Sequence, residues 1–88
     1  MITAAPLILV VDDDAGILDA MRALFESEDY QVETCEKGDY VESLREKTGP
    51  LPDLIVLDVR LSGKDGREIC RALKSDDATR HIPVVMIS

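Results

Sequence analysis

The residues of this chain that could do chemistry are aspartates that follow two apolar runs. Leu7–Val11 leads directly into the acidic triplet Asp12–Asp14, and Leu54–Leu57 leads into Asp58. If both runs are neighbouring parallel strands, at least three carboxylates meet at one edge of the sheet. Crowded carboxylates raise one another's pKa and cost several kcal/mol in a low-dielectric cleft unless a cation neutralises them. The pattern therefore implies a divalent metal, and an all-oxygen ligand set favours Mg²⁺ over a cage-bound Ca²⁺.

Length and composition indicate one small, acidic domain. The chain has 88 residues, of which 45% are hydrophobic but only 3% aromatic. This describes a core of Val, Ile, Leu and Met, which is ordinary for a parallel sheet covered on both faces. The formal net charge of −8 opposes contact with phosphate backbones and anionic membranes, so we expect no direct nucleic-acid binding.

The sequence carries no sign of export or of a membrane span. Cys35 and Cys70 have neither CxxC nor metal-site spacing, which favours a reduced setting. The residues before Leu7–Val11 lack a basic region, and that run is far too short for a membrane span or a signal segment. We therefore expect a cytoplasmic protein with no membrane association.

Four segments have the patterns of strands. Leu7–Val11, Leu54–Leu57 and Val84–Ile87 are unbroken apolar runs rich in β-branched residues, which predicts central strands covered on both faces. Tyr30–Cys35 alternates polar and apolar residues instead, which is typical of a strand at a protected edge.

Three helices are expected between these strands. Apolar residues recur at helical spacing over Ala15–Glu28, and Asp14 is placed to cap that helix. A short second helix is expected over Asp39–Lys47, because Gly49 and Pro50 follow it as a stop signal. A third should follow Gly66 and fray around 76–80.

The alternation of strands and helices predicts an α/β fold. Crossover connections of this length favour a doubly wound parallel sheet with helices on both faces and a strand order 2-1-3-4. Its topological switch point lies between strands one and three, where ligands bind in such sheets, and Asp12, Asp13 and Asp58 sit at those strand ends. A merely solvated charge run is the alternative interpretation of the triplet.

The assembled motifs resemble the receiver domain of two-component response regulators. They are VVDDD after the first strand, Leu57-Asp58 after the third, Asp65-Gly66 in the loop that follows, and the stretch Ile82–Ser88. The resemblance spans the whole chain and implies the flavodoxin-like topology of that family. It also implies a phosphoacceptor signalling module that receives a phosphoryl group from a histidine kinase or a phosphotransfer protein.

The resemblance assigns roles to five residues. Asp58 is the expected phosphoacceptor, and the hydroxyl of Ser88 would contact the phosphoryl group. Asp12, Asp13 and Asp58 would bind Mg²⁺ together with the backbone carbonyl of Arg60. The Arg60 side chain could lean over the site and alter phosphoryl lifetime, or point into solvent, which we favour. Such a chain assists its own phosphorylation and dephosphorylation, but we expect it not to be an enzyme.

One part of the family pattern is not found. Receivers have a fifth strand with a Lys that pairs with the phosphoryl group, an aromatic switch residue and two further helices, all beyond the position of Ser88. We therefore expect residues 1–88 to be a single, incomplete receiver domain: a fragment, an incompletely resolved chain, or a short chain completed by self-association or a partner. The outer edge of Val84–Ile87 would invite self-association.

Other functions fit the sequence less well. A haloacid-dehalogenase-type phosphatase needs a second acid two residues after its nucleophile, where this chain has Arg60. A dinucleotide-binding half-domain needs GxGxxG after the first strand, which is absent. The main alternative is a receiver-like scaffold that binds proteins without being phosphorylated. Asp12, Asp13 and Asp58 disfavour the scaffold, and the missing Lys favours it.

Overall fold

The computed structural model describes residues 5–38, 41, 44, 50–61 and 63–87. The helix expected over Asp39–Lys47 falls largely on other residues and lies outside this part. Val41 and Leu44, the two described residues of that segment, are buried. The expected hydroxyl of Ser88 also lies outside the described residues.

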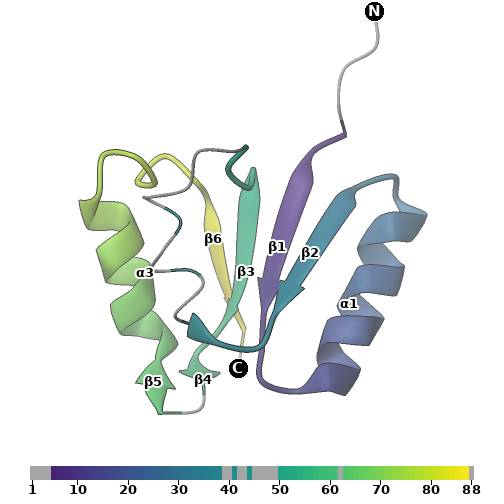
Figure 1. Ribbon diagram of the computed structural model, residues 1–88, viewed down its shortest axis with the longest axis horizontal. Coiled ribbons are helices and arrows are strands. Elements are labelled where there is room, and N and C mark those ends of the chain that lie inside the picture. The colour runs from purple at the N-terminus through teal and green to yellow at the C-terminus, as the bar shows by residue number, and fades with distance from the viewer. Residues whose placement is uncertain (1–4, 39–40, 42–43, 45–49, 62, 88) are drawn as a thin grey trace, which may run out of the picture.

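Four parallel strands form one sheet (Figure 1). The strands are β1 (Leu7–Val11), β2 (Gln31–Cys35), β3 (Leu54–Asp58) and β6 (Val84–Ile87), in the order β2-β1-β3-β6. This confirms the predicted fold class and the strand order 2-1-3-4. In the β1–β3 pairing Val11 lies opposite Leu57, so the next residue of each strand emerges at the same level of the same edge.

The first helix, α1 (Ala15–Ser27), begins where the sequence predicts. The carboxylate of Asp14 accepts hydrogen bonds from the backbone N–H groups of Gly16 at 2.8 Å and Ile17 at 3.3 Å. These bonds satisfy two donors that the first turn of a helix leaves free. Asp14, the third acid of the triplet, is therefore the N-cap of α1.

The helix expected after Gly66 is α3 (Gly66–Ser75). Its cap is Asp65, which accepts from the Arg67 N–H at 2.9 Å and also forms an exposed ion pair with the Arg67 guanidinium. Hydrogen bonding to Arg67 holds the pKa of the Asp65 carboxyl below its usual value. Among the described helices, none is long and apolar enough to cross a bilayer.

The two helices cover opposite faces of the sheet. Alternate residues of each strand point to opposite faces of the sheet, so a continuous apolar run buries side chains on both faces. This arrangement is the double winding predicted for the chain. Buried residues on the α1 side are Ile8, Val10, Leu18 and Val56, and those on the α3 side include Leu9, Val11, Ile55, Leu57, Ile69 and Leu73.

A small hairpin that the sequence did not predict follows the third strand. β4 (Arg60–Leu61) pairs antiparallel with β5 (Lys64–Asp65), and Gly63 in the turn has a φ of 74°. Strands of two residues are too short to show a period of two, although a glycine between them is a turn signal. The hairpin ties the end of β3 to the start of α3.

The two edges of the sheet differ. On the outer edge of β2, Arg22 donates to the carbonyl of Val32 and to the Thr34 hydroxyl, both at 3.2 Å, which confirms a protected edge. β6 was predicted to be a central strand covered on both faces. The described structure does not show this coverage, since Val85 is 48% exposed. The position of β6 at the other edge of the sheet is the one that the predicted strand order implies. An apolar run indicates that a strand can be buried, but it does not show that another element covers that strand.

A buried threonine closes the far end of α3. Thr79 is 1% exposed, and its hydroxyl donates to the carbonyl of Leu73 at 2.8 Å. Close by, the Lys74 ammonium donates to the carbonyl of Ile82 at 2.6 Å. Both bonds satisfy carbonyls near the point where the helix turns into the loop before β6.

Replacing Thr79 by valine should lower the free energy of unfolding by about 1 kcal/mol, because the shape is kept while the carbonyl of Leu73 loses the hydroxyl donor and keeps the longer bond from the Asp76 N–H at 3.4 Å. Urea denaturation measures this directly. Thr79→Ser, which keeps the hydroxyl, is the matched control and should lose less. Equal stability of wild type and Thr79→Val would contradict the role of this hydrogen bond.

Candidate functional site

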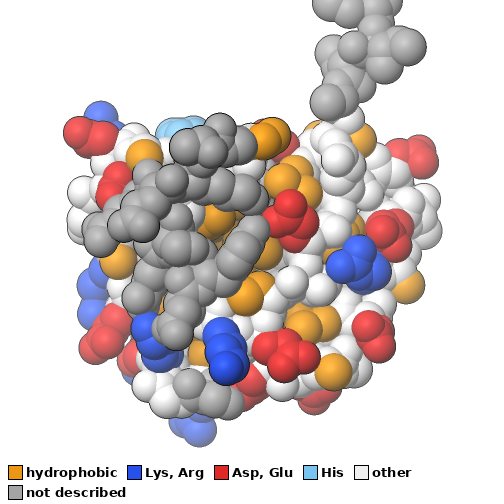
Figure 2. Space-filling model, viewed as in Figure 1, with side chains coloured by type: hydrophobic (Ala, Val, Ile, Leu, Met, Phe, Trp, Pro, Cys, Tyr) orange, Lys and Arg blue, Asp and Glu red, His pale blue; other side chains and the backbone are white. Residues whose placement is uncertain are grey.

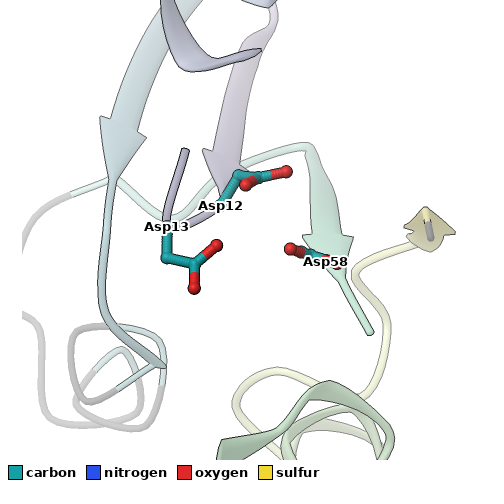
Figure 3. Close-up of side chains that lie close together, drawn as sticks. All are labelled: Asp12, Asp13 and Asp58. Atoms are coloured by element: carbon teal, nitrogen blue, oxygen red, sulfur yellow. The ribbon is translucent and has the colours of Figure 1, made fainter. Parts of the chain in front are cut away.

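Three carboxylates from two strand ends converge at the switch point of the sheet (Figure 3). Asp12 and Asp13 follow β1, and Asp58 ends β3, the neighbouring strand. One carboxylate oxygen from each of the three lies within 4.8 Å of the others. In the close-up, the Asp58 side chain points from its strand toward the two acids of the first strand. The convergence expected from the sequence is present.

Asp12 is the buried member of this acidic cluster. Its residue is 2% exposed, and its carboxylate accepts a hydrogen bond from the Asp14 N–H at 2.9 Å. Burial raises the pKa of the Asp12 carboxyl above its ordinary value, and the charges of Asp58 and Asp13 add to the rise, against the lowering effect of that hydrogen bond. The fold therefore holds an anion where it is costly to keep one.

Backbone groups orient Asp58. The residue is half-buried at the end of β3, and its carboxylate accepts from the Arg60 N–H at 3.1 Å. The neighbouring N–H, from Val59, donates to the carbonyl of Ile87 in β6 at 2.8 Å. The peptide after the strand is thus held by the sheet, and one carboxylate oxygen is held by its own chain.

The chemistry of the donors fits a hard divalent cation. The cluster offers carboxylate oxygens alone, the type of ligand that Mg²⁺ prefers, and a cation would relieve both the burial of Asp12 and the repulsion among the three acids. The arrangement can therefore hold a metal ion beside a carboxylate that could act as a nucleophile.

The Arg60 side chain lies in a different place. It is exposed and lines a hollow of about 450 Å³ with Lys64 and Arg67, and the described residues that line this hollow do not include the three carboxylates. Figure 2 shows basic side chains over the hairpin and the start of α3. This placement agrees with the interpretation in which the Arg60 side chain points into solvent. The role of its backbone carbonyl as a metal ligand stays a prediction.

Two residues beside the acidic cluster, Gly66 and Val59, make contacts that the sequence did not indicate. The contact of Gly66 with the backbone of Asp58 was not foreseen from the sequence. Val59 was not singled out, although both of its peptide groups are hydrogen-bonded, to Ile87 and to Gly66. The one signal for these contacts is the Asp65-Gly66 pair at the start of a helix.

Two curated relatives illustrate what the chain resembles. It is 43% identical over 81 residues to the response regulator PleD of Caulobacter vibrioides and 37% identical over 84 residues to the phosphate regulon transcriptional regulatory protein PhoB of Rhizobium meliloti. The alignments cover 92% and 94% of this chain, but only 17% and 36% of those proteins. The chain thus spans about a third or less of the length of these relatives.

Solved receiver structures have the same fold. The N-terminal domain of a response regulator receiver protein from Methanoculleus marisnigri superposes with a TM-score of 0.81 at 37% identity, covering 93% of this chain and 65% of that one. The phosphorylated cyanobacterial phytochrome response regulator RcpA gives 0.85 at 31%, covering 94% and 64%. The receiver domain of a sensor histidine kinase from Pseudomonas aeruginosa, with magnesium in its active-site cleft, gives 0.85 at 25%, covering 97% and 68%.

These relatives correct one expectation. The chain was expected not to be an enzyme, yet the proteins it matches are response regulators, whose receiver domains combine the role of phosphoacceptor with autophosphatase activity. A domain that speeds hydrolysis of its own acyl phosphate is performing catalysis. The label "not an enzyme" is therefore wrong for a member of this group.

A family-wide match covers almost the whole chain. The family described as the response regulator receiver domain matches residues 8–88, a stretch that contains both acidic strand ends and all the described helices and strands except the first residue of β1. The chain belongs to the response regulator receiver domain family.

Proposed function

We propose that this chain is the phosphoacceptor of a two-component system, taking a phosphoryl group from a histidine kinase or a phosphotransfer protein onto Asp58. Mg²⁺ would be held by Asp12, Asp13, Asp58 and the backbone carbonyl of Arg60. The observation that carries the proposal is the approach of three carboxylate oxygens to within 4.8 Å at the switch point. A receiver that kept only the fold would have no need of this costly cluster.

In the proposed transfer, Asp58 is the nucleophile. One carboxylate oxygen attacks the phosphorus of a phosphohistidine in line as the P–N bond breaks, and the imidazole leaves with the bonding electrons. Mg²⁺, when bound, supplies neutralisation of the charge on the phosphoryl oxygens. The Arg60 N–H holds the other carboxylate oxygen, which keeps the attacking one directed. The Ser88 hydroxyl remains our prediction for the group that contacts the bound phosphoryl.

Two neighbours support this reading. RcpA was solved as a phosphorylated protein, and the Pseudomonas aeruginosa receiver was solved with magnesium in its active-site cleft. Both alignments cover more than nine-tenths of this chain. We carry phosphorylation and magnesium binding to this chain because it keeps the acidic cluster, and not because of the likeness alone.

The setting we propose is cytoplasmic. Cys35 and Cys70 are both free and half-buried, which suits a reducing compartment. Neither thiol has a place in the proposed chemistry, and both pack as small apolar groups against the α3-side core.

Asp58→Asn should abolish phosphorylation by acetyl phosphate in the presence of Mg²⁺, because an amide cannot form the acyl phosphate. Intact-protein mass spectrometry detects the added phosphoryl group. Asp19→Asn, which removes the same charge from an exposed position of α1, is the control and should be phosphorylated like wild type. Failure of wild type to bind Mg²⁺ or to incorporate phosphate would leave only the scaffold alternative.

Asp12→Asn should raise stability without metal while removing the response to Mg²⁺. Neutralising the buried acid relieves desolvation and repulsion, a gain on the order of 1 kcal/mol. Wild type should instead gain about 2.7 kcal/mol in Mg²⁺ at a hundred times its dissociation constant. Thermal unfolding with and without Mg²⁺ measures both effects.

The same substitution should alter the pH dependence. Because the pKa of Asp12 is raised on folding, the folded metal-free protein binds this proton more readily than the unfolded chain. Wild type should therefore gain stability relative to Asp12→Asn as pH falls from neutral toward 3.8, the ordinary aspartate pKa. A difference between the two proteins that does not change with pH would contradict the raised pKa.

We further propose that a polypeptide consisting of residues 1–88 pairs through β6 with β6 of a second copy. In parallel pairing with β3, the peptide groups of Val84 and Met86 face outward, and the strand carries no charge. An antiparallel two-fold pairing would join Val84 of each copy to Met86 of the other and place the two exposed Val85 side chains face to face. The acidic clusters would then lie at opposite ends of the joined strands, which limits their repulsion.

Val85→Lys should convert the dimer to a monomer, because it places two ammonium groups opposite each other at the two-fold axis. Sedimentation velocity over a range of concentrations reports the change. Leu24→Lys adds the same charge at another exposed apolar position, on α1, and should leave association unaltered. A compact wild-type monomer with a cooperative unfolding transition would overturn this pairing.

A further inference from the structure

Gly66 begins α3 in direct contact with the backbone of Asp58. The residue is buried, and a Cβ at this position would lie far inside contact distance of the Asp58 carbonyl oxygen. The same Cβ would lie 3.1 Å from both the carbonyl carbon of Asp58 and the Cα of Val59. The obstructing atoms are backbone and cannot swing aside, so only glycine allows the helix to come this close.

Hydrogen bonds from two elements fix the peptide that follows Asp58. The Gly66 N–H donates to the carbonyl of Val59 at 2.7 Å, and the Val59 N–H donates to the carbonyl of Ile87 at 2.8 Å. Both peptide groups of Val59 are therefore engaged, one with α3 and one with β6. The segment cannot rotate without leaving a buried or partly buried polar group unpaired, which is costly.

The next residue along is the one whose carbonyl would complete the metal site. Arg60 donates its N–H to the Asp58 carboxylate at 3.1 Å and pairs with Asp65, the cap of α3, across the hairpin. The contact made by Gly66 therefore sits directly behind two proposed ligands, the Asp58 carboxylate and the Arg60 carbonyl. Groups behind metal ligands set the direction of those ligands and so the affinity.

We propose that Gly66 is a positioning residue of the metal site. Its N–H donates to the carbonyl of Val59, and its lack of a Cβ lets α3 pack against the backbone of Asp58. These contacts orient the Asp58 carboxylate and the Arg60 carbonyl before a cation binds. This inference rests on the proposed function, since it takes Asp58 and Arg60 as ligands. Gly66 itself touches neither the cation nor the phosphoryl group.

The test compares Mg²⁺ affinity in two variants that both disturb α3. Gly66→Ala should raise the Mg²⁺ dissociation constant about 10- to 100-fold, the usual effect of losing support behind a ligand. Ala72→Gly is the control, because it weakens the same helix from an exposed interior position without touching the Asp58 peptide. Isothermal titration calorimetry with MgCl₂ gives the constants, and circular dichroism confirms that each variant is folded.

The outcomes separate the possibilities. Weaker binding in Gly66→Ala together with wild-type binding in Ala72→Gly supports positioning. A folded Gly66→Ala with wild-type affinity overturns it, as does an equal loss in both variants, which would mean that Mg²⁺ binding follows helix stability alone. Absence of Mg²⁺ binding by wild type would instead overturn the proposed function.

A second measurement on wild type applies even if Gly66→Ala does not fold. In protein labelled with [¹⁵N]glycine, the Gly66 amide should exchange with solvent slowly, and more slowly again when Mg²⁺ is added. The Gly63 amide in the exposed hairpin turn is the internal reference and should exchange fast in both conditions. A Gly66 amide that exchanges as fast as that of Gly63, or that ignores Mg²⁺, overturns the proposal.

Discussion

The repulsion among three carboxylates at the switch point is the constraint on which the rest of this structure depends. Asp12 is 2% exposed and its pKa is raised, so the fold keeps it ionised near Asp13 and Asp58 only at a cost in stability. A domain this small has little stability to spare. Such a cluster is explained when a cation is part of the working state, because the cation converts the cost into binding energy.

Two of the three acids are held in place by backbone groups of the loops that follow their strands. Asp12 and Asp58 each accept from the N–H two residues further on, at 2.9 Å and 3.1 Å. Turns of this kind are local and lose little entropy when formed, unlike a salt bridge between long side chains. The parallel sheet supplies the rest, since its register brings the ends of β1 and β3 to one level.

The parts of this structure that follow from local pattern could be predicted from the sequence. The apolar runs predicted β1 and β3, and Asp14 predicted the start of α1. Because neighbouring parallel strands end at the same edge of a sheet, Asp12 and Asp58 were then expected to lie close together. The hairpin β4–β5 could not be predicted, because two-residue strands carry no periodicity. The open outer edge of β6 was expected from the strand order, but the apolar run Val84–Ile87 did not indicate that the Val85 side chain is exposed. The contact of Gly66 with Asp58 depends on how a helix docks, which no local pattern encodes.

These features together limit how the site can respond to phosphorylation. An acyl phosphate on Asp58 would add about one further negative charge to a cluster that is already crowded. The peptide after Asp58 cannot relax alone, because Val59 is bonded to β6 through Ile87 and to α3 through Gly66. Any movement that relieves the added charge must therefore be shared with the edge strand or with the helix. These bonds connect the end of β3 to both the edge strand and the helix.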